Sequence, residues 1–202
     1  MMESGNTGGG LCGKDTVRLD AAPRPPEKTA DADAFRSAMR RVVGGLAVVT
    51  TRHDGRAWGM TVSAFASVCL EPPTVLVCVN ERTVTAADIH RESRFAVNLL
   101  SLDQVPVSQL CSRQGTVKFV DDHVLAGSEL PAEVNSPVLR DSLVTFDCET
   151  AEARPVGSHL VVIGTVRAVI APGLRSPLLF GQGRYQRGVD MEAVPAMTEA
   201  VA

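Results

Sequence analysis

The stretch from residue 58 to residue 80 carries the residue types that could bind a polar ligand. Its first half bears small hydroxyl groups at even spacing, on Thr61, Ser63 and Ser67. Side chains alternate across a strand, so an extended chain would place these three hydroxyls on one face. Such a row beside a sheet can hold a flat or phosphorylated ligand, although most such rows are simply solvated. The residues between them predict a side that faces the core: Met60, Val62, Ala64 and Ala66.

The elements that would position these hydroxyls are strands. Residues 46–51 and 57–65 predict a pair joined by a tight hairpin turn at Asp54-Gly55. Glu71-Pro72-Pro73 then interrupts the hydrogen bonding between strands, because proline lacks the backbone N–H that strand pairing needs. Residues 74–79 form a continuous β-branched run, which predicts a strand buried on both faces.

The remaining chain predicts more strands than helices. A first helix is expected to begin after a cap at Asp31 or Asp33 and to end at Gly44-Gly45. A second is expected at 86–92, with Thr85 as its cap and Asp88 completing a capping box, and a third at 103–113. Strands are expected at 95–100, 142–153, 159–170 and 178–187, with irregular chain at 114–141. Many strands with few short helices predict an antiparallel barrel rather than a parallel βαβ sheet.

A chain of 202 residues fits one domain with tails. Residues 31–188 would form the domain, and residues 1–30 and 189–202 would be tails, the first of them flexible because it holds few large apolar groups. Gly8, Gly10 and Gly13 spell the G-x-G-x-x-G of dinucleotide-binding folds, but no strand precedes them. We therefore interpret them as part of a glycine-rich tail.

Composition excludes several classes of function. The net charge is −3 and no Lys/Arg run is present, which argues against nucleic acid as a partner. The longest apolar runs are strand-sized, and no apolar segment follows the N-terminus, so we expect neither a membrane span nor a signal peptide. Five cysteines without C-x-x-C, and four distant histidines, predict no metal site and a reducing cytoplasm. Four of the cysteines are predicted to pack as small hydrophobes: Cys69, Cys78, Cys111 and Cys148.

Motifs of hydrolases and transferases are also missing. The sequence has no serine-elbow motif, no phosphate-binding P-loop and no carboxylate pair at a suggestive spacing. This absence does not weigh against enzymes whose cofactors carry the difficult chemistry.

Four further segments match a known pattern in order. After G-M-T-V-S-A-F-A-S-V-C-L-E-P-P-T-V-L-V-C-V at 59–79 come F-A-V-N-L-L at 95–100, K-F at 118–119, G-S-H-L-V-V-I-G-T-V at 157–166 and G-R-Y at 183–185. The chain thereby resembles the short-chain flavin reductase family. That resemblance implies the FMN-binding split barrel, a mainly β, Greek-key antiparallel fold with short helices. It also implies the role of reductase component in a two-component flavin-dependent monooxygenase.

The resemblance implies a set of flavin-binding residues. Asn80, Arg82 and Thr83 would lie near the ribityl phosphate, and Lys118-Phe119 would approach the flavin. Without it, Arg82 and Lys118 would be interpreted as solvated surface cations. Two positions depart from many relatives, since Ala64 and Cys69 stand where serine is common, and each change removes a hydroxyl. The residues expected to line the flavin are Thr61, Val62, Ser63, Ala64, Ser67 and Val68.

The nicotinamide side would be formed by His159, Arg184 and Tyr185. His159 matches the histidine of the family's G-D-H, which lies by the nicotinamide and is our candidate catalytic residue. Ser158 stands where the family usually has Asp, and a hydroxyl fixes an imidazole tautomer only weakly. Arg184 would pair with nucleotide phosphates and Tyr185 would offer a stacking surface. Without the resemblance, His159 would be interpreted as a strand-edge histidine that bonds to the backbone. The alternative for Arg184 and Tyr185 is that they are exposed residues of a C-terminal strand.

The implied activity is reduction of free flavin, FAD or FMN, by hydride transfer from NADH, with NADPH as the alternative donor. The reduced flavin would diffuse to a partner monooxygenase, and the reductase would be a homodimer. One alternative is a flavin-binding electron-transfer or carrier protein without nicotinamide-dependent turnover. Another is a pyridoxamine-phosphate type of oxidase, which should need more cationic residues for its substrate phosphate than this sequence offers.

Overall fold

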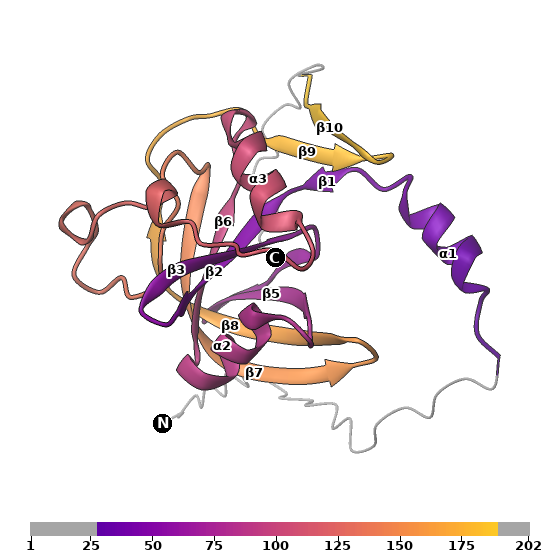
Figure 1. Cartoon of the computed structure of the whole chain (residues 1–202), viewed down its shortest axis with the longest axis horizontal. Coiled ribbons are helices and arrows are strands. Elements are labelled where there is room, and N and C mark those ends of the chain that lie inside the picture. Colours follow the sequence, from indigo (N-terminus) through magenta and orange to yellow (C-terminus); the bar gives the residue numbers. More distant parts are fainter. Residues whose placement is uncertain (1–27, 190–202) are drawn as a thin grey trace, which may run out of the picture.

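The computed structural model describes residues 28–189. Within this range the chain forms two antiparallel sheets and three α-helices (Figure 1). Of the two predicted tails, only residues 28–30 and Val189 fall inside the described range, and the G-x-G-x-x-G lies outside it. The division into a domain and tails therefore stays a prediction.

The helices and strands follow one another in short steps. The helices are α1 (Ala32–Met39), α2 (Val84–Glu92) and α3 (Val105–Ser112), and single 3₁₀ turns lie at Leu102–Gln104, Asp121–His123 and Gly127–Glu129. The strands are β1 (Gly44–Gly45), β2 (Ala47–His53), β3 (Arg56–Val62), β4 (Phe65–Leu70), β5 (Pro73–Asn80), β6 (Arg94–Leu99), β7 (Val144–Val156), β8 (His159–Ile170), β9 (Leu178–Gly181) and β10 (Arg184–Arg187).

The larger sheet closes into a barrel. Its seven strands run in the order β3-β2-β6-β7-β8-β5-β4, and every pair is antiparallel. β3 and β4 stand at opposite ends of this order, yet only Ser63 and Ala64 join them. Two residues reach only about 7 Å, so the sheet must curl until its two edges meet. The mainly β, antiparallel prediction is thus confirmed.

Two apolar cores support this architecture. One fills the barrel and includes Val77, Ile89 and Phe95. The other lies between the barrel and α3 and includes Val48, Cys111 and Leu178. The smaller sheet, in the order β1-β9-β10, flanks this second core (Figure 1).

The predicted hairpin turn and first cap are confirmed. Asp54 and Gly55 both have positive φ, 50° and 77°, as the twist of a two-residue hairpin requires. The Asp31 side chain accepts a hydrogen bond from the Ala34 N–H at 2.8 Å and so caps α1. This helix ends at Met39, however, and Gly44–Gly45 pairs with β9 instead of ending the helix.

The strand predicted over 57–65 is wrong at its end. β3 stops at Val62, Ser63 forms a bend, and β4 begins at Phe65 on the other edge of the sheet. The even row of hydroxyls is therefore broken, because alternation holds only within one strand. Ala64 and Ala66 are exposed rather than in the core.

The strand predicted at 74–79 is present as β5, but only one of its faces is covered. Val77 and Val79 are fully buried in the barrel, whereas Leu76 and Cys78 on the outer face are only half-buried. The prediction of burial on both faces is wrong for the single chain. Of the four cysteines expected to be packed, Cys111 and Cys148 are buried, Cys78 is half-buried and Cys69 is exposed.

Two other elements differ from the prediction in their bounds. The segment at 178–187 is a hairpin, because Gln182 and Gly183 turn the chain with positive φ between β9 and β10. The helix predicted at 103–113 is a 3₁₀ turn followed by α3, which has Pro106 in its first turn. β8 spans the predicted residues 159–170.

The irregular segment 114–141 is held on the barrel by buried polar groups. Asp147 on β7 is fully buried and accepts hydrogen bonds from the N–H groups of Asn135 and Ser136, at 3.1 and 3.2 Å. Asn98 on β6 accepts one from the Leu139 N–H at 2.8 Å. Hydrogen bonds to buried side chains thus attach this part of the segment to the barrel.

Two kinds of feature are missing from residues 28–189. No helix in this range is long and apolar enough to cross a membrane. Nor does the range contain a group of three His, Cys, Asp or Glu side chains placed to hold a metal ion.

Candidate functional site

A cavity of about 720 Å³ lies where β3, the end of β5 and the start of α2 meet. The segment between α3 and Lys118 forms its fourth side. Its lining residues are Trp58, Met60, Thr61, Asn80, Arg82, Thr83, Val84, Thr85, Cys111, Ser112, Gln114, Gly115, Thr116, Lys118 and His159.

The cavity brings together six residues that the sequence singled out. These residues come from four separate segments of the chain. The six are Thr61, Asn80, Arg82, Thr83, Lys118 and His159. The other eight do not line it: Val62, Ser63, Ala64, Ser67, Val68, Phe119, Arg184 and Tyr185.

The turn after β5 is fixed by its own polar groups. Asn80 Oδ1 accepts a hydrogen bond from the Arg82 N–H at 3.0 Å, and Thr83 Oγ1 donates one to the Asn80 carbonyl at 2.7 Å. The Glu81 N–H donates to the Ser158 carbonyl at 3.1 Å, which ties this turn to the β7–β8 hairpin. The Arg82 side chain is thereby carried on a rigid turn at the mouth of the cavity.

Helix α2 begins in the cavity. Its cap is Thr83, whose Oγ1 accepts from the Ala86 N–H at 3.3 Å, so the predicted cap at Thr85 is wrong by two residues. Thr85 lies instead in the first turn, fully buried, and its Oγ1 has no hydrogen-bond partner. Helix N-termini favour anions, and an unpaired buried hydroxyl beside one fits a ligand that can accept its proton.

Lys118 reaches the cavity because its segment pairs with β3. The Gly59 N–H donates to the Lys118 carbonyl at 3.0 Å, and Trp58 forms a bridge with Phe119. Burial lowers the pKa of the Lys118 ammonium from 10.5. Burial also raises the pKa of the neighbouring Cys111 thiol to about 12, so this cysteine is a packing residue and not a nucleophile.

The lining is cationic. Arg82 and Lys118 carry positive charge, and none of the described residues that line the cavity is Asp or Glu. This contrasts with a chain whose net charge is −3. The site therefore favours an anionic ligand by its charge as well as by the helix terminus.

His159 opens β8 and is exposed at the edge of the cavity. Its Nδ1 lies 2.9 Å from Ser158 Oγ. The Ser158 hydroxyl can donate a hydrogen bond to this ring nitrogen or accept one from it. It fixes the tautomer less firmly than a carboxylate would.

Two predicted residues outside the lining, Tyr185 and Phe119, are linked to the lining residues Thr61 and Trp58. Thr61 Oγ1 donates to the Ser108 carbonyl at 2.8 Å, and the Tyr185 hydroxyl donates to Ser108 Oγ at 3.2 Å, so Tyr185 packs against α3. Phe119 packs behind Trp58 with its ring centroid 5.2 Å away. Arg184 is exposed on β10.

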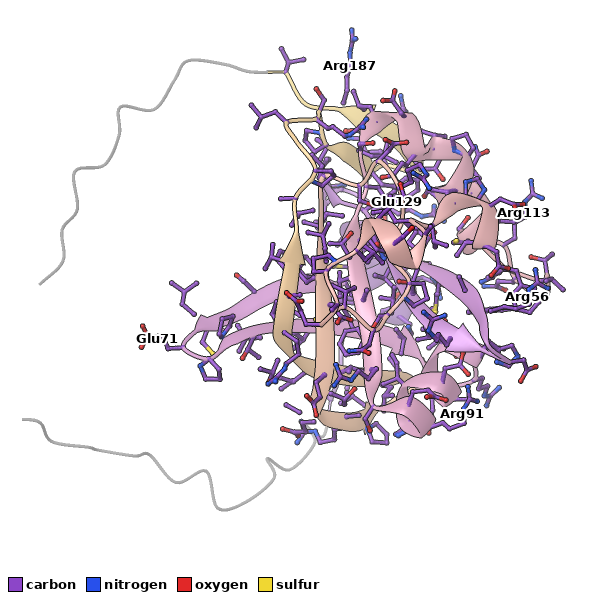
Figure 2. All side chains as sticks on the ribbon, turned by 90° about the vertical axis from the view of Figure 1, so that its left-hand side faces the viewer. Arg56, Glu71, Arg91, Arg113, Glu129 and Arg187 are labelled. Atoms are coloured by element: carbon purple, nitrogen blue, oxygen red, sulfur yellow. The ribbon has the colours of Figure 1, made fainter. Side chains whose placement is uncertain are left out.

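The residues on β4 lie elsewhere. Ser67 and Val68 are exposed on that edge strand, and Ser63 and Ala64 are exposed on the link that leads to it. Val62 is buried in the barrel core. Figure 2 shows Glu71 at the tip of the β4–β5 hairpin, which projects from the body of the molecule.

Sequence reasoning missed part of the lining. Thr85 was mistaken for a cap, and Trp58, which opens the hydroxyl-bearing stretch, was not singled out. The segment from Ser112 to Thr116 carries no local signal, because its position depends on the pairing of Lys118 and Phe119 with β3.

Known proteins share this fold and these segments. The model of the flavin reductase like domain matches residues 39–188. The chain belongs to this family. The FMN reductase (NADH) RutF of Methylorubrum populi is 36% identical over 172 residues, which cover 82% of this chain and 84% of that protein. The reductase subunit HsaB of a Mycobacterium tuberculosis flavin-dependent monooxygenase is 34% identical, over 80% of this chain and 84% of that one.

Solved structures of flavin reductases superpose on this chain. The flavin reductase PheA2 superposes with a TM-score of 0.67 at 31% identity, covering 80% of this chain and all of the other. The NADH:FAD oxidoreductase SgcE6 of Streptomyces globisporus, in complex with NAD and FAD fragments, gives a TM-score of 0.65 at 27% identity, over 79% of this chain and 93% of that one.

The cavity of this family member has the features that a flavin requires. Trp58 and Met60 offer apolar surface for a flat ring, and Arg82, Lys118 and the start of α2 offer charge for a phosphate. The unpaired Thr85 hydroxyl supplies a further donor.

Proposed function

We propose that this chain is an NADH-dependent flavin reductase that reduces free FAD or FMN and supplies the reduced flavin to a partner monooxygenase. The observation that carries this proposal is the cationic cavity, free of carboxylates among its described lining residues, in a member of the flavin reductase like family. Its relatives include an NADH-dependent FMN reductase and a monooxygenase reductase subunit, which supports both halves of the activity.

The phosphate end of the flavin is proposed to lie at the start of α2. Arg82 and Lys118 would pair with its charge, and Asn80, Thr83 and Thr85 would complete the cradle with hydroxyl and main-chain donors. The helix N-terminus adds its dipole to these groups. FAD and FMN share this first phosphate, so the cradle does not select between them.

The ring end is proposed to lie against β3. Thr61 is half-buried there, and Trp58 and Met60 supply the apolar contact. Val62, Ser63, Ala64, Ser67 and Val68 stay predictions as flavin contacts, with less support because they lie outside the cavity lining.

The reaction needs little from the protein beyond position. When bound, the flavin supplies the hydride acceptor, and the nicotinamide supplies the hydride. The chain would hold the two rings face to face, which is catalysis by proximity and orientation. His159, exposed at the cavity edge, is our candidate for the contact with the nicotinamide, and Arg184 and Tyr185 stay predictions for the nucleotide that carries it.

A homodimer is proposed because an apolar sheet face is left open beside the site. Leu76 and Cys78 on β5 pair with Ile163 and Val161 on β8, and all four point outward and are only half-buried. Asn80 and His159 form the next pair on the same face. A second copy of the chain that covered this face would therefore also form one side of the cavity. A mass measurement in solution tests this, and a monomer would contradict it.

The apolar side chains of α1 support the same arrangement. Phe35 and Met39 are 63% and 49% exposed, and no residue of this helix is buried. The helix stands apart from the barrel (Figure 1). A helix of this length has little stability of its own, so a partner surface would account for it.

The proposed activity predicts oxidation of NADH that depends on added flavin. The purified protein should consume NADH steadily when free FMN or FAD is present, and should do so more slowly with NADPH. A panel of both nicotinamides against FAD, FMN and riboflavin measures this by the absorbance of NADH. Tightly bound flavin without turnover would favour the carrier alternative instead. The partner monooxygenase and a cytoplasmic location remain predictions from the sequence.

The lowered pKa of Lys118 predicts a pH dependence of flavin binding. Because its pKa lies below 10.5, the ammonium should lose its proton, and the phosphate should lose that partner, at a lower pH than an ordinary lysine would allow. The affinity for FMN should therefore fall as pH rises toward 10.5. Lys118→Arg should remove this decline, since guanidinium stays charged. Equal pH profiles for both proteins, measured by calorimetry, would refute the role of Lys118.

A further inference from the structure

Three rings pack together behind the wall of the cavity. The His53 ring at the end of β2 lies 5.4 Å from the Trp58 ring, edge to face, and 6.3 Å from the Phe119 ring. Trp58 and Phe119 meet edge to face at 5.2 Å. Trp58 and Lys118, the neighbour of Phe119, line the cavity, whereas His53 does not. His53 therefore packs against Trp58 and Phe119 without lining the cavity itself.

A buried carboxylate holds His53 in place. Asp88 on α2 is fully buried, and its Oδ1 lies 3.1 Å from His53 Nδ1 and 2.7 Å from Arg91 Nη2. Its Oδ2 accepts a hydrogen bond from Thr51 Oγ1 at 3.0 Å. A buried charge with three partners is held firmly, because leaving any of its oxygens unpaired is costly. The orientation of the imidazole is therefore fixed by α2.

The other side of the ring cluster is fixed by a second ion pair. The Arg56 guanidinium lies 3.7 Å above the Phe119 ring and 2.8 Å from Asp121 Oδ2. Asp121 Oδ1 also accepts from the Ala57 N–H at 2.9 Å. The remaining charged neighbour of His53 is Asp54, 3.7 Å from its Nε2. Figure 2 shows Arg56 and Arg91 on the side of the molecule away from the hairpin tip at Glu71.

We propose that His53 and Asp88 are positioning residues for the flavin site. Asp88 fixes the His53 ring, and this ring holds Trp58 and the Lys118-Phe119 segment in the arrangement that the flavin binds. The role of Trp58 as a flavin contact rests on the proposed function, whereas the dependence of Trp58 on His53 does not. Loss of either residue should therefore affect the KM for flavin more than kcat.

Trp58 makes this inference directly measurable. It is the only tryptophan of the chain, so fluorescence and near-UV circular dichroism in the tryptophan band report on this ring alone. His53→Ala and Asp88→Asn should each shift the Trp58 emission and weaken its circular dichroism band. Loss of the aromatic contact to Trp58 should raise the Kd for FMN about 2- to 13-fold, with kcat at saturating flavin changed less than about 2-fold.

Matched variants separate positioning from general damage. His53→Phe keeps a ring at this position and should restore much of the Trp58 signal lost in His53→Ala. His90→Ala, on the exposed side of α2, should change neither the spectrum nor the Kd. If Asp88→Asn does not fold, Arg91→Ala removes an exposed partner of the same carboxylate and should give a smaller change in the same direction.

Unchanged Trp58 spectra in His53→Ala would overturn the inference, and so would changed spectra with an unaltered Kd for FMN. A wild-type protein that binds no flavin would refute the proposed function and with it the functional half of the inference. In that case the spectra would still decide whether His53 positions Trp58.

Discussion

Replacing Lys118 or Arg82 by methionine is expected to raise the KM for flavin about 10- to 100-fold. Each side chain carries positive charge into a cavity whose described lining residues include no Asp or Glu. A hydrogen bond to a charged group contributes about 1.5–3 kcal/mol, which corresponds to this range. Methionine keeps most of the side-chain length and apolar surface while removing the charge. Steady-state kinetics with FMN as the varied substrate measure the effect.

Two controls make this result specific. Arg113→Met removes a cation that is exposed just after α3 and does not line the cavity, so its KM should stay within about 2-fold of wild type. Riboflavin lacks the phosphate, so the KM for riboflavin should respond far less to Lys118→Met or Arg82→Met than the KM for FMN does. If both flavins lost affinity equally, the phosphate could not be the partner of these two cations.

Replacing Asn98 by alanine is expected to lower the free energy of unfolding by about 3 kcal/mol. Asn98 is fully buried on β6, and its Nδ2 donates to the Val48 carbonyl and to Thr50 Oγ1 at 3.0 and 2.9 Å. Its Oδ1 accepts from the Leu139 N–H and from Thr145 Oγ1 at 2.8 and 2.9 Å. Alanine would leave these buried donors without a partner. The Tm should fall by about 10 °C in a thermal melt.

Asn135→Ala is the matched control for this substitution. Asn135 is exposed, its Nδ2 donates only to the Glu133 carbonyl within its own loop, and its main-chain N–H keeps the bond to Asp147. The free energy of unfolding should change by less than about 0.5 kcal/mol. Similar melting temperatures for Asn98→Ala and wild type would show that the loop over residues 135–139 does not depend on the buried amide.

Local chemistry made much of the fold predictable. The Asp54-Gly55 turn, the Asp31 cap and β8 follow from residue types whose preferences act within a few positions. The end of β3 does not, because the bend at Ser63 is imposed by the closure of the barrel, a long-range constraint. Burial of β5 was overestimated because a β-branched run does not show which of its faces other elements cover, and in the single chain only the inner face is buried.

The same distinction between local and long-range interactions applies to the candidate site. The resemblance singled out Asn80, Arg82 and Thr83, and these three residues occupy one turn beside the cavity. Lys118 joined them by resemblance, because nothing in its own neighbourhood shows that its segment pairs with β3. The pairing of His53 with Asp88 gave no signal, since the two residues are 35 positions apart and meet only in the folded chain. Asp88 was instead predicted to complete a capping box with Thr85.

A crystal structure of the protein with FMN and NAD⁺ bound tests the central claim most directly. We predict that the flavin ring lies against Trp58 and Met60, its phosphate at Arg82, Lys118 and the start of α2, and the nicotinamide over the flavin beside His159. Flavin bound at a different surface, with this cavity empty at full occupancy of both ligands, would contradict it.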